Sequence, residues 1–303
     1  MQLSYWEIKN WFSHVDYTIV GSGIVGLHCA LALRERFPDS KIVVLEKGIL
    51  PQGASTKNAG FACFGSISEI IDDLKTHTEE EVIQLIQKRY SGLQLLRKNL
   101  GDAALDLKPF GGYELFLKEY ESFYNECEQK IPFINDLLKP LFKADVFVKQ
   151  VDRFQFGEIL EHLIFNPFEA QIDTGNMMQA LLKKAHQNDI LILNSQTVTH
   201  HQEVNDGVEV LTNGISFTTK KLVFATNGFA AQLTHHQVQP ARAQVLITKP
   251  IPNLSIKGTF HLDRGYYYFR NVGNRILLCC ASNKSFDTEC TTVLETNEVI
   301  QAA

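Results

Sequence analysis

The stretch that decides the fold runs from Asp16 to Gly48 and reads DYTIVGSGIVGLHCALALRERFPDSKIVVLEKG. Apolar residues at 17–20 predict a buried strand, and the apolar run Ile24–Leu33 predicts a helix that packs on a sheet. A second strand is expected at 41–45, directly before Glu46. Strand, glycine-rich turn, helix and second strand, in this order, are typical of a βαβ unit that binds a dinucleotide.

The turn between the first strand and the helix carries three glycines. It reads Gly21-Ser22-Gly23-Ile24-Val25-Gly26. In such a motif the first glycine permits the tight turn, the second lets the main chain approach a pyrophosphate, and the third lets helix and strand touch. Free N–H groups at the helix start would face the anion. Glu46 follows where a carboxylate can accept from a ribose hydroxyl and would repel a 2′-phosphate. The alternative is an ordinary structural strand–turn–helix.

Composition and charge limit the class of protein. The 303 residues are 45% hydrophobic, with a net charge of −5 and no block of like charge. This composition predicts a globular core and no electrostatic footprint for nucleic acid or anionic lipid. The six cysteines lack C-x-x-C spacing, and the segment MQLSYWEIKNWF is too polar for a signal peptide and predicts a short amphipathic helix. With no apolar run of membrane-spanning length, these features predict a cytoplasmic protein with reduced thiols.

The loop after the second strand contains Gly53-Ala54-Ser55-Thr56-Lys57-Asn58-Ala59-Gly60. Small polar residues between glycines predict a loop, and a loop this close to a phosphate site commonly wraps the ligand. Together with the glycine turn and Glu46, this run resembles the D-amino-acid oxidase family of FAD-dependent oxidoreductases, which includes glycine oxidase and sarcosine oxidase. The resemblance implies that the loop passes along the FAD pyrophosphate and beside the flavin. Lys57 stands where some relatives attach FAD through a histidine, which implies non-covalent FAD; a plain polar loop is the alternative.

The resemblance extends to two later segments. Val198 stands where relatives place a backbone contact to the adenine, and Ala225-Thr226-Asn227 stands where a strand meets the cofactor. A structural turn explains the last segment equally well when it is taken alone. The expected FAD-binding residues are Gly21, Ser22, Gly23, Ile24, Val25, Gly26, Glu46, Lys47, Ala54, Ser55, Asn58, Ala59, Gly60, Val198, Ala225, Thr226 and Asn227.

Helical periodicity and turn residues place the other elements. Helices are expected at 78–101, where Thr78 and Glu81 form a capping box, at 119–138 and at 177–187. Strands are expected at 111–117, 190–193, 207–212, 215–219 and 221–225. Chemistry cannot be assigned to residues 140–172 from their pattern.

These elements predict an α/β protein with two interleaved domains. One is a Rossmann-like FAD-binding domain with a mostly parallel sheet, at 15–65 and 170–235. The other is an α+β substrate domain on an antiparallel sheet, at 66–169 and 236–303. In the family this second sheet roofs the flavin, and substrate lies between the two domains.

Four stretches after residue 240 alternate like strands. They are 242–248, 259–262, 266–270 and 275–280. The third carries the expected catalytic residues. Tyr267 aligns with the family tyrosine that lines the substrate pocket, and Arg270 could bind a substrate carboxylate through a bidentate pair. The alternative is an aromatic strand with a surface arginine.

Two further features bear on activity. No metal is expected, because the pairs His200-His201 and His235-His236 point to opposite faces of a strand and lack further ligands. Residues 298–303 end in what the pattern predicts as the middle of a helix, whereas relatives continue with an arginine, a second glycine-rich turn and a closing helix. A fragment and a shortened member both fit this pattern.

The resemblance implies oxidation of an amine or amino acid by hydride transfer to flavin N5, followed by hydrolysis of the imine. A small-molecule substrate is expected, with no nucleic acid and no membrane span. An NAD-dependent dehydrogenase shares the glycine turn and Glu46, but the Gly53–Gly60 loop and the strand at 221–225 favour FAD. A truncated, non-catalytic flavin-binding protein is the other alternative.

Overall fold

The computed structural model describes residues 3–280 and 285–301. The chain divides into two units. The first unit comprises Met1–Asn58, Thr174–Ala241 and Cys290–Thr292, and the second comprises Ala59–Asp173, Arg242–Glu289 and Val293–Ala303. The assignment of FAD binding to one unit and substrate binding to the other stays a prediction.

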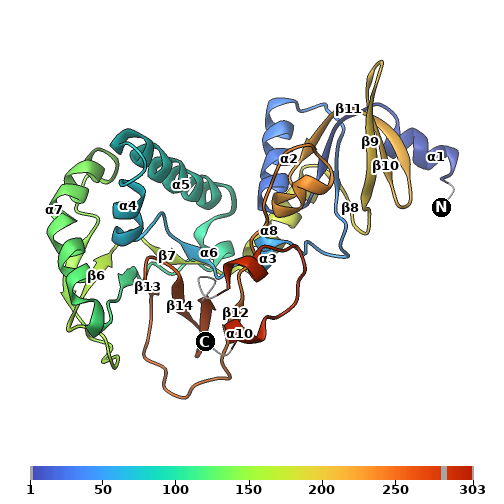
Figure 1. The fold of residues 1–303 in the computed structure, drawn as a ribbon. Coiled ribbons are helices and arrows are strands. Elements are labelled where there is room, and N and C mark those ends of the chain that lie inside the picture. Colours follow the sequence, from blue (N-terminus) through green and yellow to red (C-terminus); the bar gives the residue numbers. More distant parts are fainter. Residues whose placement is uncertain (1–2, 281–284, 302–303) are drawn as a thin grey trace. The chain divides into compact units, whose positions relative to one another are not determined.

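The first unit is built on a six-stranded sheet in the order β8-β2-β1-β11-β10-β9 (Figure 1). Its strands are β1 (Val15–Val20), β2 (Ile42–Leu45), β8 (Leu191–Leu193), β9 (Val198–Val204), β10 (Gly207–Thr212) and β11 (Ser216–Phe224). The pairs β1·β2, β1·β11 and β2·β8 are parallel, and β9, β10 and β11 form an antiparallel meander. Helix α2 (Ile24–Arg36) follows β1, and α8 (Thr174–Gln187) precedes β8.

One strand boundary differs from the prediction. Two strands were expected at 215–219 and 221–225, but residues 216–224 form the single strand β11. Thr219 pairs with Val15 of β1 on one side and with Val208 of β10 on the other, so the two ladders overlap at this residue. No glycine or proline interrupts the stretch, and one continuous strand satisfies the hydrogen bonds of both neighbours.

The second unit contains a seven-stranded sheet in the order β12-β15-β14-β13-β4-β6-β5. Its strands are β4 (Gly112–Glu114), β5 (Val148–Val151), β6 (His162–Asn166), β12 (Val245–Ile247), β13 (Thr259–Leu262), β14 (Tyr267–Val272) and β15 (Arg275–Cys280). The expected antiparallel sheet is corrected in one place, since β13 runs parallel to β4. A short ribbon pairs β3 (Phe61–Ala62) with β7 (Ala170–Gln171).

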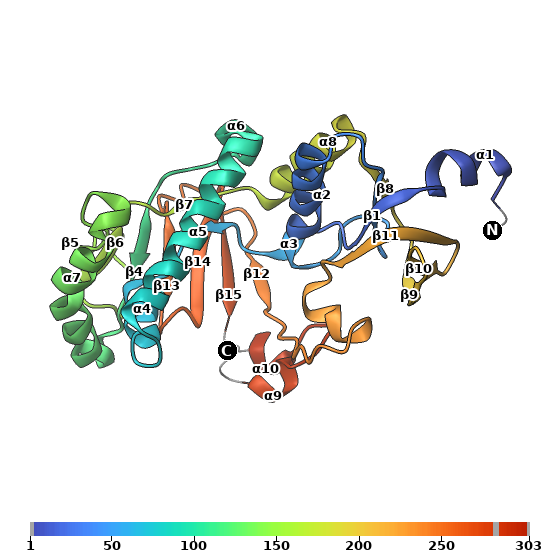
Figure 2. The ribbon, with the colours of Figure 1, turned by 90° about the horizontal axis from the view of Figure 1, so that it is seen from above.

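Three helices of the second unit are α4 (Ile67–Asp73), α5 (Glu79–Leu100) and α7 (Glu121–Phe142) (Figure 2). Helix α5 confirms the predicted capping box, because the Thr78 side chain accepts from the Glu81 N–H and the Glu81 carboxylate accepts from the Thr78 N–H. Gly101 follows its last turn with φ +82°, a conformation that favours glycine.

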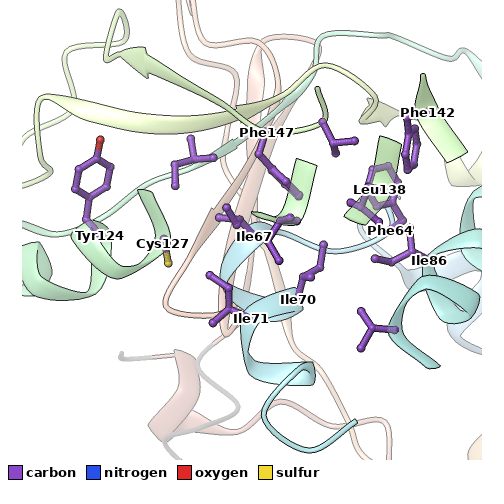
Figure 3. Packing of buried hydrophobic residues seen from close by; sticks show 14 of the residues in the cluster. Phe64, Ile67, Ile70, Ile71, Ile86, Tyr124, Cys127, Leu138, Phe142 and Phe147 are labelled. Carbon is purple, nitrogen blue, oxygen red and sulfur yellow. The ribbon is translucent and has the colours of Figure 1, made fainter. Parts of the chain in front are cut away.

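An apolar cluster of this unit lies between these helices and the sheet. It includes Phe64, Ile67, Ile70, Ile86, Leu138 and Phe142 (Figure 3). Residues from three helices and from the segment before α4 therefore share one core, which fixes the stretch that follows the Gly53–Gly60 loop.

Shorter helices complete the described chain. They are α1 (Tyr5–Glu7), the π-helix η1 (Ile8–Phe12), α3 (Ala54–Lys57), α6 (Asp102–Leu105), η2 (Lys118–Tyr120), η3 (Asn227–Gln232), α9 (Phe286–Glu289) and α10 (Glu298–Gln301). Among the residues that the structure describes, none of the helices combines the length and the apolarity that crossing a membrane requires.

Candidate functional site

The glycine turn after β1 has no room for a side chain at Gly21 or at Gly26. Gly21 has φ +106°, and a Cβ there would lie 2.6 Å from the Ala225 carbonyl oxygen. A Cβ on Gly26 would lie 1.9 Å from the Gly21 carbonyl oxygen. The end of β11, the turn and the first turn of α2 therefore touch through their backbones. This close packing is what the first and third glycines of a dinucleotide-binding turn provide.

The start of α2 faces the loop that the sequence predicts to wrap the cofactor. Gly23 is the N-cap and offers no side-chain hydrogen bond to the first helical turn. The Ile24 N–H donates to Ser55 Oγ over 2.9 Å, and a Cβ on Gly23 would lie 3.0 Å from the same oxygen. Asn58 closes the loop helix α3 by donating from Nδ2 to the carbonyl oxygens of Ala54 and Ser55. A helix N-terminus without a side-chain cap, beside a hydroxyl that can donate onward, is suited to an anion.

Glu46 lies against the glycine turn rather than away from it. Its side chain is buried, and Oε2 accepts from Ser22 N over 3.2 Å and from Ser22 Oγ over 2.8 Å. Oε1 accepts from the Gly48 N–H over 2.9 Å. An ionised carboxylate has about four acceptor positions. These three bonds fix the orientation of Glu46 and leave capacity for one further donor, such as a ribose hydroxyl.

The end of β11 contributes a buried hydroxyl beside the turn. Ala225 N–H donates to the Val20 carbonyl oxygen over 2.8 Å, which brings Thr226 next to Gly21. Thr226 Oγ1 is buried and has no hydrogen-bond partner among the described residues. A buried polar atom without a partner costs about 1–3 kcal/mol, so it is an expected contact for a ligand. Asn227 follows with φ +47° and opens η3.

Two other expected cofactor residues lie in the first unit without a described contact to the turn. Lys47 Nζ lies 4.0 Å from the centre of the Phe229 ring. Val198 is buried in the core at the start of β9 and pairs with Thr212. Ala59 and Gly60 belong to the second unit. The structure therefore brings together Gly21–Gly26, Glu46, Ser55 and Ala225–Thr226.

Arg270 is not the surface arginine that the alternative interpretation predicted. It is 7% exposed and donates from Nε to the Ala59 carbonyl oxygen. Its Nη2 donates to the Ile172 carbonyl oxygen over 3.0 Å, and its Nη1 to Gln171 Oε1 over 3.4 Å. The guanidinium thus points at the last residues of the Gly53–Gly60 loop.

The structure does not bring Tyr267 and Arg270 together, although both were expected at the substrate. Side chains alternate along β14, so residues three apart lie on opposite faces of the sheet. The ring of Tyr268, on the face of Arg270, contacts Phe61 with ring centres 5.1 Å apart. Tyr267 instead lines a cavity of about 670 Å³ with Phe123 and Leu278. Tyr267 and Arg270 therefore cannot both contact a substrate that lies on one face of the sheet.

A buried polar cluster in the second unit was missed by sequence reasoning. His261 Nε2 lies 2.9 Å from Glu169 Oε2, and Thr259 Oγ1 donates to the same oxygen over 2.8 Å. On β4, Glu114 lies opposite His261 in the ladder and accepts from the N–H and the hydroxyl of Ser68. The cluster draws on four separate segments, so no local motif could reveal it.

Both titrating groups of this cluster have shifted pKa values. Burial lowers the pKa of His261, but the Glu169 carboxylate outweighs burial and raises it to about 9. Burial raises the pKa of Glu114 to about 7, against the hydrogen bonds from Ser68. Within residues 3–280 and 285–301, no group of three or more His, Cys, Asp or Glu side chains is placed to hold a metal ion.

The fold and the turn define an oxidoreductase unit that binds an adenine dinucleotide. The chain belongs to the DAO family, described as FAD dependent oxidoreductase, whose model matches residues 16–302. This membership decides between the two cofactors considered from the sequence in favour of FAD. The glycine turn and the Thr226 hydroxyl, which has no partner among the described residues, fit that cofactor.

Individual relatives are similar to this chain at low sequence identity, and two of them are solved structures that share its fold. Probable oxidoreductase OrdL of Haemophilus influenzae is 22% identical over an alignment of 311 positions, which covers 94% of this chain and 68% of OrdL. Glycine oxidase from Geobacillus kaustophilus is 20% identical with a TM-score of 0.64, covering 88% of this chain and 70% of that enzyme. L-proline dehydrogenase from P. horikoshii is 18% identical with a TM-score of 0.65, covering 95% and 74% of the two chains.

Proposed function

We propose that this chain oxidises the carbon–nitrogen single bond of a small amine or amino acid with non-covalently bound FAD. The observation that carries the proposal is the start of α2. Its N-cap residue Gly23 has no side chain, and its Ile24 N–H donates to Ser55 Oγ. Thr226, whose Oγ1 has no partner among the described residues, lies next to Gly21. Likeness to the solved structures of a glycine oxidase, an L-proline dehydrogenase and an iminodiacetate oxidase supports the substrate class.

In this proposal the first unit holds the adenine dinucleotide. Backbone amides at the start of α2 and the Ser55 hydroxyl bind the pyrophosphate, and Glu46 accepts from the ribose. Thr226 Oγ1 donates to the cofactor and so gains the partner it lacks among the described residues. Ala54, Asn58, Lys47, Val198 and Asn227 stay predictions as further contacts.

The second unit supplies the substrate side in this proposal. When bound, FAD would supply the acceptor for a hydride from the carbon that carries the neutral amine, and the imine product would be hydrolysed in water. The protein orients that carbon and excludes water, so no acid–base pair is required at the substrate. Tyr267 stays a prediction as a pocket residue. The buried hydrogen bonds of Arg270 to Ala59, Ile172 and Gln171 favour a role other than binding a substrate carboxylate.

The experiment uses the full chain saturated with FAD. The expected result is a flavin absorption spectrum, with flavin released into the supernatant when the protein is denatured. Anaerobic addition of glycine, sarcosine, L-proline, iminodiacetate and both series of amino acids is expected to bleach the spectrum for at least one compound. Colourless protein that binds no FAD would contradict the cofactor site, and flavin-loaded protein that no compound bleaches would contradict the substrate class.

A further inference from the structure

The Ala59–Gly60 turn lies at the open end of the β3–β7 ribbon. Phe61 and Ala62 pair with Gln171 and Ala170, and the Ile172 N–H donates to the Gly60 carbonyl oxygen over 2.9 Å. Beyond this bond the ladder ends, although the surroundings remain buried, with Ala59 7% and Ile172 6% exposed. Carbonyl oxygens left without donors in such a place are costly.

Arg270 supplies these donors. Its planar guanidinium reaches Ala59 O, Ile172 O and Gln171 Oε1, which lie on both sides of the ribbon end. Gln171 is tied back to the sheet, since its Nε2 donates to Gly258 O and to Asn271 Oδ1. A lysine has one nitrogen and cannot span acceptors placed in this way.

The turn also fits tightly around the guanidinium. Gly60 has φ +72°, and a Cβ there would lie 2.3 Å from the Ile172 carbonyl oxygen and 2.7 Å from Arg270 Nη2. The backbone conformation of this residue is therefore fixed by its neighbours on two sides. Burial lowers the pKa of Arg270, while the Asp173 and Asp106 carboxylates act in the opposite direction. Its hydrogen bonds go to neutral oxygens of the protein.

We propose that Arg270 is a positioning residue that holds the Ala59–Gly60 turn in its cofactor-binding conformation before FAD arrives, and is not a ligand of the substrate carboxylate. This inference rests on the proposed role of the Gly53–Gly60 loop in binding FAD. Preorganisation of the turn lowers the ordering cost of binding, so Arg270 raises FAD affinity without touching substrate.

The first test compares Arg270→Lys with Arg275→Lys. Arg275 lies on the neighbouring strand β15 and donates from Nη1 to the Thr248 carbonyl oxygen over 2.8 Å, with no described contact to the loop. R270K keeps the positive charge but loses the branched guanidinium that reaches several acceptors. It is expected to raise the FAD Kd at least tenfold. R275K is expected to change it less than twofold. In R270K reloaded at saturating FAD, the KM for substrate is expected to stay within twofold of wild type.

Two outcomes overturn the inference. An unchanged FAD Kd with a lowered Tm shows that Arg270 only stabilises the fold, and a large rise in substrate KM at saturating FAD shows that it binds substrate.

If R270K does not fold, hydrogen exchange of the wild-type protein tests the proposal instead. The peptide 58–62 is expected to be protected without FAD, and free exchange in the apoprotein overturns the proposal. Wild-type protein that binds no FAD while this peptide is protected refutes the proposed function alone.

Discussion

His261 and Glu169 form a buried ion pair in the second unit, with Nε2 of the imidazole 2.9 Å from Oε2 of the carboxylate. Glu114 lies opposite His261 on the adjacent parallel strand, so one imidazolium is placed between two carboxyl groups. The pKa of His261 is raised to about 9 and that of Glu114 to about 7. Both shifts couple folding to protonation.

Stability is therefore expected to fall as the pH rises. A raised histidine pKa adds stability that is fully present below its ordinary value of 6.5 and is lost as the pH rises through about 9. The raised pKa of Glu114 acts in the same direction between 4.5 and about 7. Urea unfolding followed by circular dichroism should show a lower free energy of unfolding at pH 9.5 than at pH 6. His261→Gln should reduce this difference by on the order of 2 kcal/mol.

His200→Gln provides the control, because His200 is exposed on β9. This variant should retain the wild-type pH dependence. If H261Q and wild type lose stability in parallel between pH 6 and 9.5, the ion pair does not carry the effect.

Thr226→Val tests the cofactor site through one atom. The change removes a buried hydroxyl that has no partner among the described residues, so the apoprotein should be as stable as wild type or slightly more stable. FAD affinity should fall about tenfold, corresponding to roughly 1–2 kcal/mol for one hydrogen bond. Flavin fluorescence quenching measures the Kd, and thermal unfolding without FAD measures stability.

Thr18→Val is the matched control for this substitution. Thr18 Oγ1 is also buried without a partner among the described residues, but it lies inside β1 rather than beside the turn. T18V should leave the FAD Kd unchanged. Equal losses of affinity in both variants would show that the effect comes from the sheet and not from a contact with FAD.

Gly26→Ala is expected to abolish FAD binding. The new Cβ would lie 1.9 Å from the Gly21 carbonyl oxygen, so α2 must move away from β1 and the turn must open. Backbone displacement of this kind costs several kcal/mol, on the order of 2–4. Gly92→Ala is the control, since Gly92 lies in α5 of the second unit and nothing lies within 4 Å of a Cβ there. Retained flavin in G26A at wild-type Kd would refute the turn as the pyrophosphate site.

Glu289 links α9 to Arg242 through a bidentate pair, with contacts of 2.8 and 2.7 Å. Hydrogen bonds from Arg242 lower the pKa of Glu289 to about 2, from an ordinary 4.5. A lowered carboxyl pKa adds stability that is present above 4.5 and is lost as the pH falls towards 2. Glu289→Gln should lose about 2–3 kcal/mol at pH 7 and much less at pH 3.

The partly exposed pair of Glu128 and Lys149 serves as the control for this prediction. Glu128→Gln should cost less than about 1 kcal/mol at either pH. Urea unfolding at pH 3, 5 and 7 makes the comparison, and an E289Q deficit that is the same at all three values would exclude the ionised pair as its source.

Local patterns predicted the elements that carry their own signal. The glycine turn, α2 and the capping box at Thr78 follow from short-range spacing and are present in the structure. Strands β5 and β6 were missed, because β5 is largely exposed and its alternation is weak. The parallel pair of β13 and β4 was missed because pairing partners far apart in sequence leave no local trace.

The site residues show the same limit. Spacing predicted that Glu46 and the turn would meet, because the βαβ unit fixes their geometry. Arg270 was expected at a substrate carboxylate because its residue type allows that role. Its actual acceptors, including Ala59 211 positions earlier, depend on tertiary packing that no motif encodes. Strand periodicity alone could have separated Tyr267 from Arg270.

Strand β1 acquires its second neighbour very late in synthesis. The first neighbour, β2, follows β1 within one βαβ unit. The other edge of β1 stays unpaired until β11 is made, because Val15 pairs with Thr219 of β11. Until a ribosome has translated through residue 224, the nascent chain presents an unpaired, apolar strand edge that invites association with other chains. Chaperone demand during translation should therefore peak while the second unit's first segment is being made, and should end once β11 has emerged.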